Sequence, residues 1–220
     1  AAPTPAPPPS QVTSLQFTEE MKGHLAAGVT STTHAEFEAA ELQGKAANGA
    51  FMFHLVVNIR DVDHFVTSPQ HATTADGYVE SPLVGGRCEV AGGTINLFVD
   101  AGDPTRKNMR YRLKFTGKDG LPYTLTGFKD VSGRTFAELW PETTTLFTTL
   151  FRGHVDEGAT GPVAATGVLH IRPEDFLFVQ LFSFRVQGPT LAARTQAMAR
   201  FGAFFFGKVW DVYGHQIGPF

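Results

Sequence analysis

Residues 54–71 contain a dense group of titratable side chains: His54, Asp61, Asp63, His64 and His71. A carboxylate beside a histidine can orient that histidine for acid–base catalysis, and the same side-chain types bind metal ions. The spacing matches neither a helix-borne HExxH motif nor a known zinc pattern. On a strand, Asp61 and Asp63 would share one face while His64 points to the other, which argues against a joint site. The alternative is that both aspartates cap the turn after a strand at 51–60.

Acid–base chemistry inside a barrel would need His54 or His170 to converge with a carboxylate, for which Asp61 and Asp63 are the candidates. No serine stands in a GxSxG motif. Cys88 is the only cysteine in these 220 residues, so they form no intramolecular disulfide and no cysteine-based zinc site. We therefore predict no metal site and no cofactor, and a non-catalytic role is favoured over an enzyme.

Alternating apolar and polar residues indicate that most of the chain forms strands. In 109–115, Met109, Tyr111, Leu113 and Phe115 alternate with basic residues, and this period of two predicts one buried and one solvated face. Further strands are predicted at 15–25, 51–60, 94–99, 122–131, 143–155, 165–172 and 178–188. Glycine-containing pairs predict hairpin turns at Asp76-Gly77, Gly85-Gly86 and Gly92-Gly93.

The pattern changes to a helical period after Gly188-Pro189. Thr190 is a candidate N-cap, and a stripe at spacings of three and four follows it: Met198, Phe201, Phe205, Val209 and Val212. We predict an all-β fold, an antiparallel barrel or barrel-like sandwich, with a C-terminal helix at 190–213. Residues 1–14 are read as a Pro-rich linker or disordered arm, and 15–220 as a single β-rich domain.

A weak internal repeat relates the two halves of the chain. Residues 15–25 align with 121–131, and 34–46 align with the threonine-rich strand at 143–155. The segment 34–46 is rich in Ala and Glu, which favours a helix. The repeat instead favours a strand leading into a hairpin at Asn48-Gly49, and we predict a strand there.

Phenylalanine content gives the main indication of function. The chain has 20 Phe against 4 Tyr and 2 Trp, and Phe lines apolar space without a polar group. A barrel of about eight to ten strands can hold one apolar ligand. The candidate ligand-binding residues are Phe147, Phe151, Phe182, Phe184, Phe204 and Trp210. A plain Phe-rich core is the alternative.

The net charge of −3 argues against binding to nucleic acid. No apolar run reaches the roughly 18 residues that a membrane-spanning helix needs. Phe204, Phe206 and Trp210 lie partly off the helical stripe, so a peripheral membrane surface or a second copy of the chain stays open as a partner. The single cysteine favours the cytoplasm. A Pro-rich start left after signal-peptide removal would instead indicate a secreted or periplasmic protein.

Four segments resemble an accessory domain of bacterial glucose–methanol–choline flavin oxidoreductases of the cholesterol-oxidase-like type. They are FTEEMKGHL, LWPETTTLFTTLFRGH, GVLHIRPEDFLFVQLFSFRVQG and RFGAFFFGKVWDVYG, and the likeness would cover most of 15–214. The chain has no GxGxxG fingerprint, so the resemblance is to the non-flavin module. It implies association with an oxidoreductase domain or subunit and with hydrophobic or steroid-like substrates, and it carries over no catalytic residue.

Together these patterns predict a non-catalytic module that binds an apolar small molecule, lipid or sterol-like, in a Phe-lined barrel. Two alternatives stay open. One is a cofactor-free isomerase, cyclase or lyase that uses a histidine and a carboxylate in the barrel. The other is a structural or docking domain without a ligand.

Overall fold

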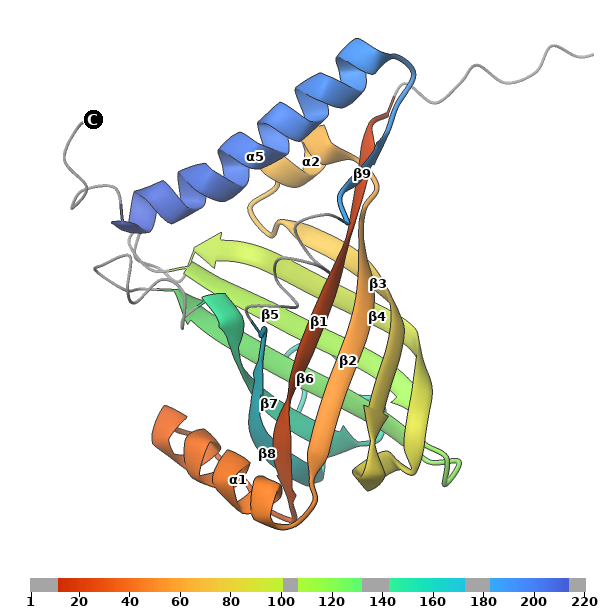
Figure 1. Cartoon of the computed structure of the whole chain (residues 1–220), viewed down its shortest axis with the longest axis vertical. Helices are drawn as coiled ribbons and strands as arrows, with labels where there is room; N and C mark the ends of the chain where they lie inside the picture. The colour runs from red at the N-terminus through yellow and green to blue at the C-terminus, as the bar shows by residue number, and fades with distance from the viewer. Residues whose placement is uncertain (1–11, 101–106, 132–142, 173–182, 214–220) are drawn as a thin grey trace, which may run out of the picture.

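Eight antiparallel strands close into a barrel (Figure 1). The computed structural model describes residues 12–100, 107–131, 143–172 and 183–213, with side chains up to residue 205. The strand order is β2-β3-β4-β5-β6-β7-β8-β1, and β1 pairs again with β2 to close the barrel. The strands are β1 Ser14–Ala27, β2 Ala50–Ile59, β3 Ala72–Ser81, β4 Gly86–Asp100, β5 Lys107–Thr116, β6 Pro122–Val131, β7 Thr145–Arg152 and β8 Val163–His170. The predicted antiparallel barrel is confirmed.

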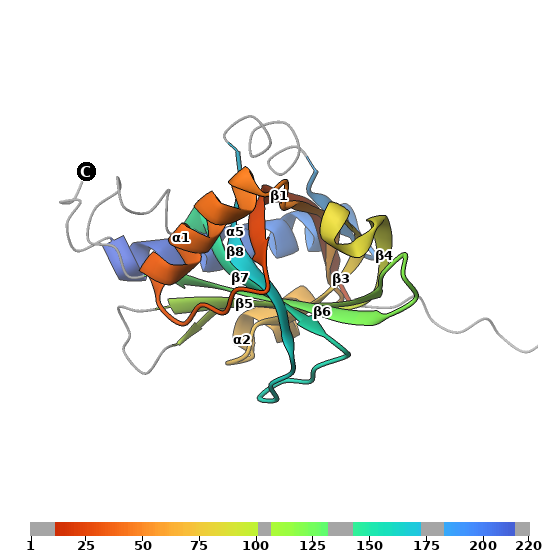
Figure 2. The same cartoon turned by 90° about the horizontal axis from the view of Figure 1, so that it is seen from below.

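Helices cover one end and one side of this barrel. The long helix α5 Leu191–Tyr213 crosses one end together with α2 Val62–Thr67, and we call this the cap end (Figure 1). The helix α1 His34–Ala46 lies against the outside of β1 and β8 (Figure 2). A short strand, β9 Arg185–Gln187, adds to β1 near the cap end, and the 3-10 turn η1 Pro82–Val84 joins β3 to β4.

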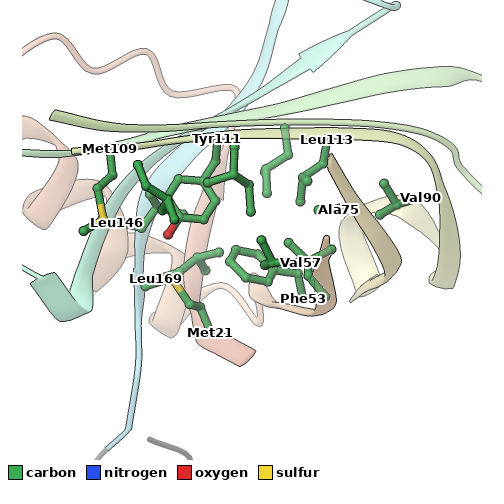
Figure 3. Packing of buried hydrophobic residues seen from close by; sticks show 14 of the residues in the cluster. Met21, Phe53, Val57, Ala75, Val90, Met109, Tyr111, Leu113, Leu146 and Leu169 are labelled. Atoms are coloured by element: carbon green, nitrogen blue, oxygen red, sulfur yellow. The ribbon is translucent and has the colours of Figure 1, made fainter. Parts of the chain in front are cut away.

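The barrel interior is packed with apolar side chains from opposite walls (Figure 3). Phe53 from β2, Leu113 from β5 and Leu169 from β8 are all fully buried. Burial of a Phe or Leu side chain stabilises the fold by roughly 1.5–3 kcal/mol. The predicted alternation in 109–115 is confirmed, because all four of its apolar residues are buried.

The prediction of a strand at 34–46 is wrong, since this segment forms α1. Thr33 accepts a hydrogen bond from the backbone N–H of Glu36, and the Glu36 carboxylate accepts one from the N–H of Thr33, which makes a capping box. The segment can be a helix because it covers the outer face of the barrel, where Phe37 packs on Phe128 and Phe147. The repeat therefore pairs a helix with strand β7 at this point.

Two predicted hairpin turns lie inside strands instead. Gly77 is in β3 and Gly93 is in β4, each beside a β-bulge. A Cβ atom on Gly77 would lie 2.1 Å from the carbonyl oxygen of His54, and one on Gly93 would lie 2.3 Å from that of Ala75. Glycine is needed at both positions for close approach of neighbouring strands. The sequence patterns also missed β3 and α2.

The predicted C-terminal helix is confirmed as α5, which begins directly after the predicted N-cap Thr190. Thr190 accepts a hydrogen bond from the backbone N–H of Ala193 at 3.1 Å, as expected of an N-cap. Of the predicted strand at 178–188, β9 is described, while residues 173–182 lie outside the described part. The predicted Pro-rich arm at 1–14 overlaps β1 at Ser14. Residues 1–11 of this arm lie outside the described part of the chain.

Candidate functional site

A buried polar cluster lies inside the barrel beneath its cap end. It consists of Glu19 in β1, Tyr111 in β5 and Lys129 in β6, which we call the polar cluster. The exposed fractions of Glu19 and Lys129 are 2% and 1%. Lys129 Nζ donates to Glu19 Oε1 at 3.0 Å, and the Tyr111 hydroxyl donates to both Glu19 oxygens at 3.0 and 3.1 Å. One carboxylate thus receives donors from two other strands of the barrel.

Strand periodicity explains why these three side chains point inward. Glu19 follows Leu15 and Phe17 on the buried face of β1, and Lys129 lies between Gly127 and Val131 on that of β6. Each charged residue therefore takes a position that the pattern would give to an apolar residue. Because the two residues lie 110 positions apart, only closure of the barrel brings them together.

The electrostatics of the polar cluster are those of a charge pair held away from water. Burial raises the pKa of Tyr111 well above its usual 10.0, and the negative charge of Glu19 raises it further. Tyr111 is therefore a neutral donor to the carboxylate. The Lys129 ammonium also lies 5.0 Å from the centre of the Tyr111 ring, a cation–π contact. Replacing a buried ion pair by apolar residues is often neutral or stabilising, so stability alone does not explain this pair.

Phenyl rings from several segments meet at the cap end, where Phe17 takes the inward position next to Glu19 on β1. We call them the aromatic cap: Phe17, Phe65, Phe98, Phe184, Phe201 and Phe204. Their ring centres lie 5.1 to 6.4 Å apart in contacting pairs. His71 packs against Phe204 at 4.5 Å, and its Nδ1 lies 2.9 Å from the carbonyl oxygen of Phe65.

Phe98 is placed in the aromatic cap by a strained backbone conformation. A β-bulge in β4 falls between Asn96 and Val99, and Phe98 has a φ of 50°. A bulky residue rarely takes positive φ, which costs roughly 1–3 kcal/mol. The result is a fully buried ring that meets Phe204 edge-on at 6.2 Å.

The polar cluster lies next to a change of partner along β1. On the side opposite β2, residues 14–16 of β1 pair with β9 and residues 22–27 pair with β8. Between these two pairings, the Thr18 backbone N–H donates to Ser183 Oγ at 2.8 Å. Glu19 is the next residue and points into the barrel.

The candidate acid–base histidines lie on the outer face of the barrel. His54 Nδ1 is 2.8 Å from Glu20 Oε2, and His170 Nε2 is 3.0 Å from Glu41 Oε1. Although burial of Glu20 acts to raise its pKa, hydrogen bonds from Lys22 and His54 outweigh it and hold that pKa below the usual 4.5. The structure therefore pairs both histidines with a carboxylate, but not with Asp61 or Asp63 and not inside the barrel.

Asp61 and Asp63 lie at the start of α2. Asp61 is the N-cap, and its carboxylate accepts a hydrogen bond from the backbone N–H of His64 at 3.0 Å. Asp63 forms an ion pair with Arg200 of α5. Asp61 therefore caps a helix just after β2, as the capping alternative expects, whereas Asp63 caps nothing and links α2 to α5.

The candidate ligand-binding phenylalanines divide between two places. Phe184 and Phe204 belong to the aromatic cap. Phe147 and Phe151 lie on the outer face of β7, because Leu146 and Leu150 take its buried face. Phe147 stacks on His34 of α1 at 4.2 Å, so it does not line the interior. Phe182 and the side chain of Trp210 lie outside the described part.

Within the described residues, no group of three or more His, Cys, Asp or Glu side chains could hold a metal ion. None of the helices in this same part of the chain has the length and hydropathy to cross a membrane. Comparison with family models, curated proteins and solved structures finds no match to the chain.

Proposed function

We propose that the protein binds an apolar small molecule, lipid or sterol-like, inside the barrel at its cap end. The observation that carries this proposal is the aromatic cap itself. Six phenyl rings from five segments meet at one end of a closed barrel, and one of them, Phe17, takes the inward position next to Glu19 on β1. Phenyl rings favour apolar ligands, and the polar cluster offers a few fixed hydrogen-bonding groups, as small-molecule sites commonly do.

Helix α5 is the part of the cap that a ligand could displace without opening the barrel. It contributes Phe201 and Phe204, and it contacts α2, β9 and β1. In the described residues the barrel closes by strand pairing alone, so movement of α5 leaves those hydrogen bonds in place. A ligand would take the space of some of the rings, since an eight-stranded barrel holds either side chains or one small molecule.

We also propose that this binding serves an oxidoreductase domain or subunit. The support is the resemblance of the four segments given above to a non-flavin accessory domain. A module that holds an apolar substrate would fit that association, because such substrates are poorly soluble in water.

Acid–base catalysis by His54 or His170 has less support, because both histidines face outward. The substitutions His54→Ala and His170→Ala should each leave ligand binding unchanged. If no small molecule binds in the barrel interior, the remaining alternative is a structural or docking domain without a ligand.

Native mass spectrometry of the purified protein tests the proposal. We expect an adduct of lipid size that organic extraction removes, and recovery of the adduct when a sterol or a fatty alcohol is added back. A bare protein mass before and after addition, together with no fluorescence increase of an apolar dye, would refute binding.

A further inference from the structure

Lys129 has more hydrogen-bond donors than its surroundings accept. An ammonium group has three N–H donors. Among the residues that the structure describes, Glu19 Oε1 is the one acceptor that hydrogen-bonds Lys129 Nζ, and the Tyr111 ring is its second contact. Lys129 is 1% exposed, so bulk water does not reach it readily. A buried donor without an acceptor is destabilising, so an oxygen atom placed beside Nζ would be stabilising.

The charges already present restrict which oxygen atom can be added. Glu19 and Lys129 carry one charge of each sign and neutralise each other, and Tyr111 is neutral. A ligand carboxylate would leave one uncompensated negative charge in the interior, which is strongly unfavourable. A hydroxyl or carbonyl group adds an acceptor without adding charge. A hydroxyl could also donate to Glu19, which accepts from Lys129 and Tyr111 alone among the described residues.

We propose that the polar cluster selects neutral ligands with a single hydroxyl or carbonyl oxygen, and that this oxygen accepts a hydrogen bond from Lys129 Nζ. This inference rests on the proposed function, because the apolar body of the ligand lies within the aromatic cap. It excludes two other classes of apolar molecule as preferred ligands. Fatty acids carry the extra charge, and hydrocarbons leave the ammonium donors unmet.

A matched ligand series tests the inference, with displacement of an apolar fluorescent dye as the measurement. The series is hexadecane, cetyl alcohol, methyl palmitate and palmitate, which share their chain length and differ at one end. We expect cetyl alcohol and methyl palmitate to bind at least about tenfold more tightly than palmitate or hexadecane, a difference of about 1.4 kcal/mol.

Two variants separate selection by the polar cluster from general apolar binding. The double variant Glu19→Gln/Lys129→Met removes both charges together, so it leaves no unpaired buried ion and should fold. In it, cetyl alcohol should bind no more tightly than hexadecane. The control Lys114→Met changes a lysine on the outer face of β5 that pairs with Asp156, and it should keep the full preference.

The outcomes distinguish the two proposals. If palmitate binds as tightly as cetyl alcohol, or if the double variant keeps the preference, selection by Lys129 is wrong while apolar binding stands. If no member of the series displaces the dye from the unmodified protein, both proposals fail together.

Discussion

Lys129 Nζ lies 3.0 Å from Glu19 Oε1 in the interior of the barrel, and both side chains are almost fully buried. Breaking such a pair by removing one partner leaves the other charge without compensation, which costs about 3–5 kcal/mol. We therefore expect Lys129→Met to lower the free energy of unfolding by that amount, measured by urea denaturation. The double variant Glu19→Gln/Lys129→Met should lie much closer to the unmodified protein. Equal losses in the single and double variants would show that the charge pair is not the cause.

Tyr111 should make stability fall at high pH. Its pKa is raised in the folded protein, so the unfolded chain loses this proton near 10.0 while the folded protein keeps it. The contribution of the hydroxyl is complete below pH 10.0 and is lost as pH rises above it. The advantage of the unmodified protein over Tyr111→Phe, about 1.5–3 kcal/mol for a hydrogen bond to a carboxylate, should shrink above that pH. Denaturation curves over a range of pH give this difference, and a constant gap would contradict the assignment.

Phe201 occupies the centre of the aromatic cap, with ring centres of five other Phe side chains within 6.4 Å. Exchange for alanine leaves a cavity, and Phe201→Ala should lower the free energy of unfolding by about 3–5 kcal/mol. It should also increase the fluorescence of an apolar dye at saturation. Met198→Ala, on the exposed side of the same helix, is the control and should change neither quantity appreciably. Identical behaviour of the two variants would argue against a closed cap.

Gly167 allows β8 to approach β1 closely. A Cβ atom on Gly167 would lie 2.1 Å from the carbonyl oxygen of His24. Gly167→Ala should therefore destabilise the fold by about 1–3 kcal/mol, as overpacking does, and shift the urea midpoint downward. The matched control is Gly92→Ala, where a Cβ atom would meet nothing within 4 Å. If Gly167→Ala and the control have the same urea midpoint, β8 and β1 can move apart without loss of stability.

Glu36 should make α1 sensitive to acid. Hydrogen bonds from the backbone and side chain of Thr32 and from the backbone of Thr33 lower the pKa of its carboxyl from 4.5 to about 2. A lowered pKa contributes stability above the unfolded value of 4.5, and this contribution is lost as pH falls toward 2. The difference in thermal midpoint between the unmodified protein and Glu36→Gln should be constant above that window and vanish below it. A difference independent of pH would mean that the charge of Glu36 does not contribute to the capping box of α1.

The faces of the strands could be predicted from the sequence because a period of two directly gives the buried side. Residues 109–115 show this, since Tyr111 and its apolar neighbours are all buried. The segment 34–46 was predicted wrongly because a weak repeat outweighed local chemistry. Thr33 and Glu36 form a capping-box pattern that is visible in the sequence and that correctly indicates the start of α1.

The polar cluster was missed, although part of its signal is present. Glu19 and Lys129 each interrupt the apolar face of a predicted strand, and a charge at such a position indicates a buried partner. The sequence alone could not say which charge pairs with which, because that depends on how the barrel closes. The outward position of His54 follows from the same alternation, since Phe53 and Leu55 take the buried face of β2.

Photoaffinity labelling tests the central claim most directly, because it locates the ligand. A photoactivatable fatty alcohol would be bound, cross-linked and mapped by peptide mass spectrometry. Binding inside the barrel predicts labels on Phe17, Tyr111 and Phe201, and their loss when unlabelled cetyl alcohol competes. Labels confined to exposed residues of α5, such as Leu191 and Met198, would place the ligand on the surface and contradict the proposal.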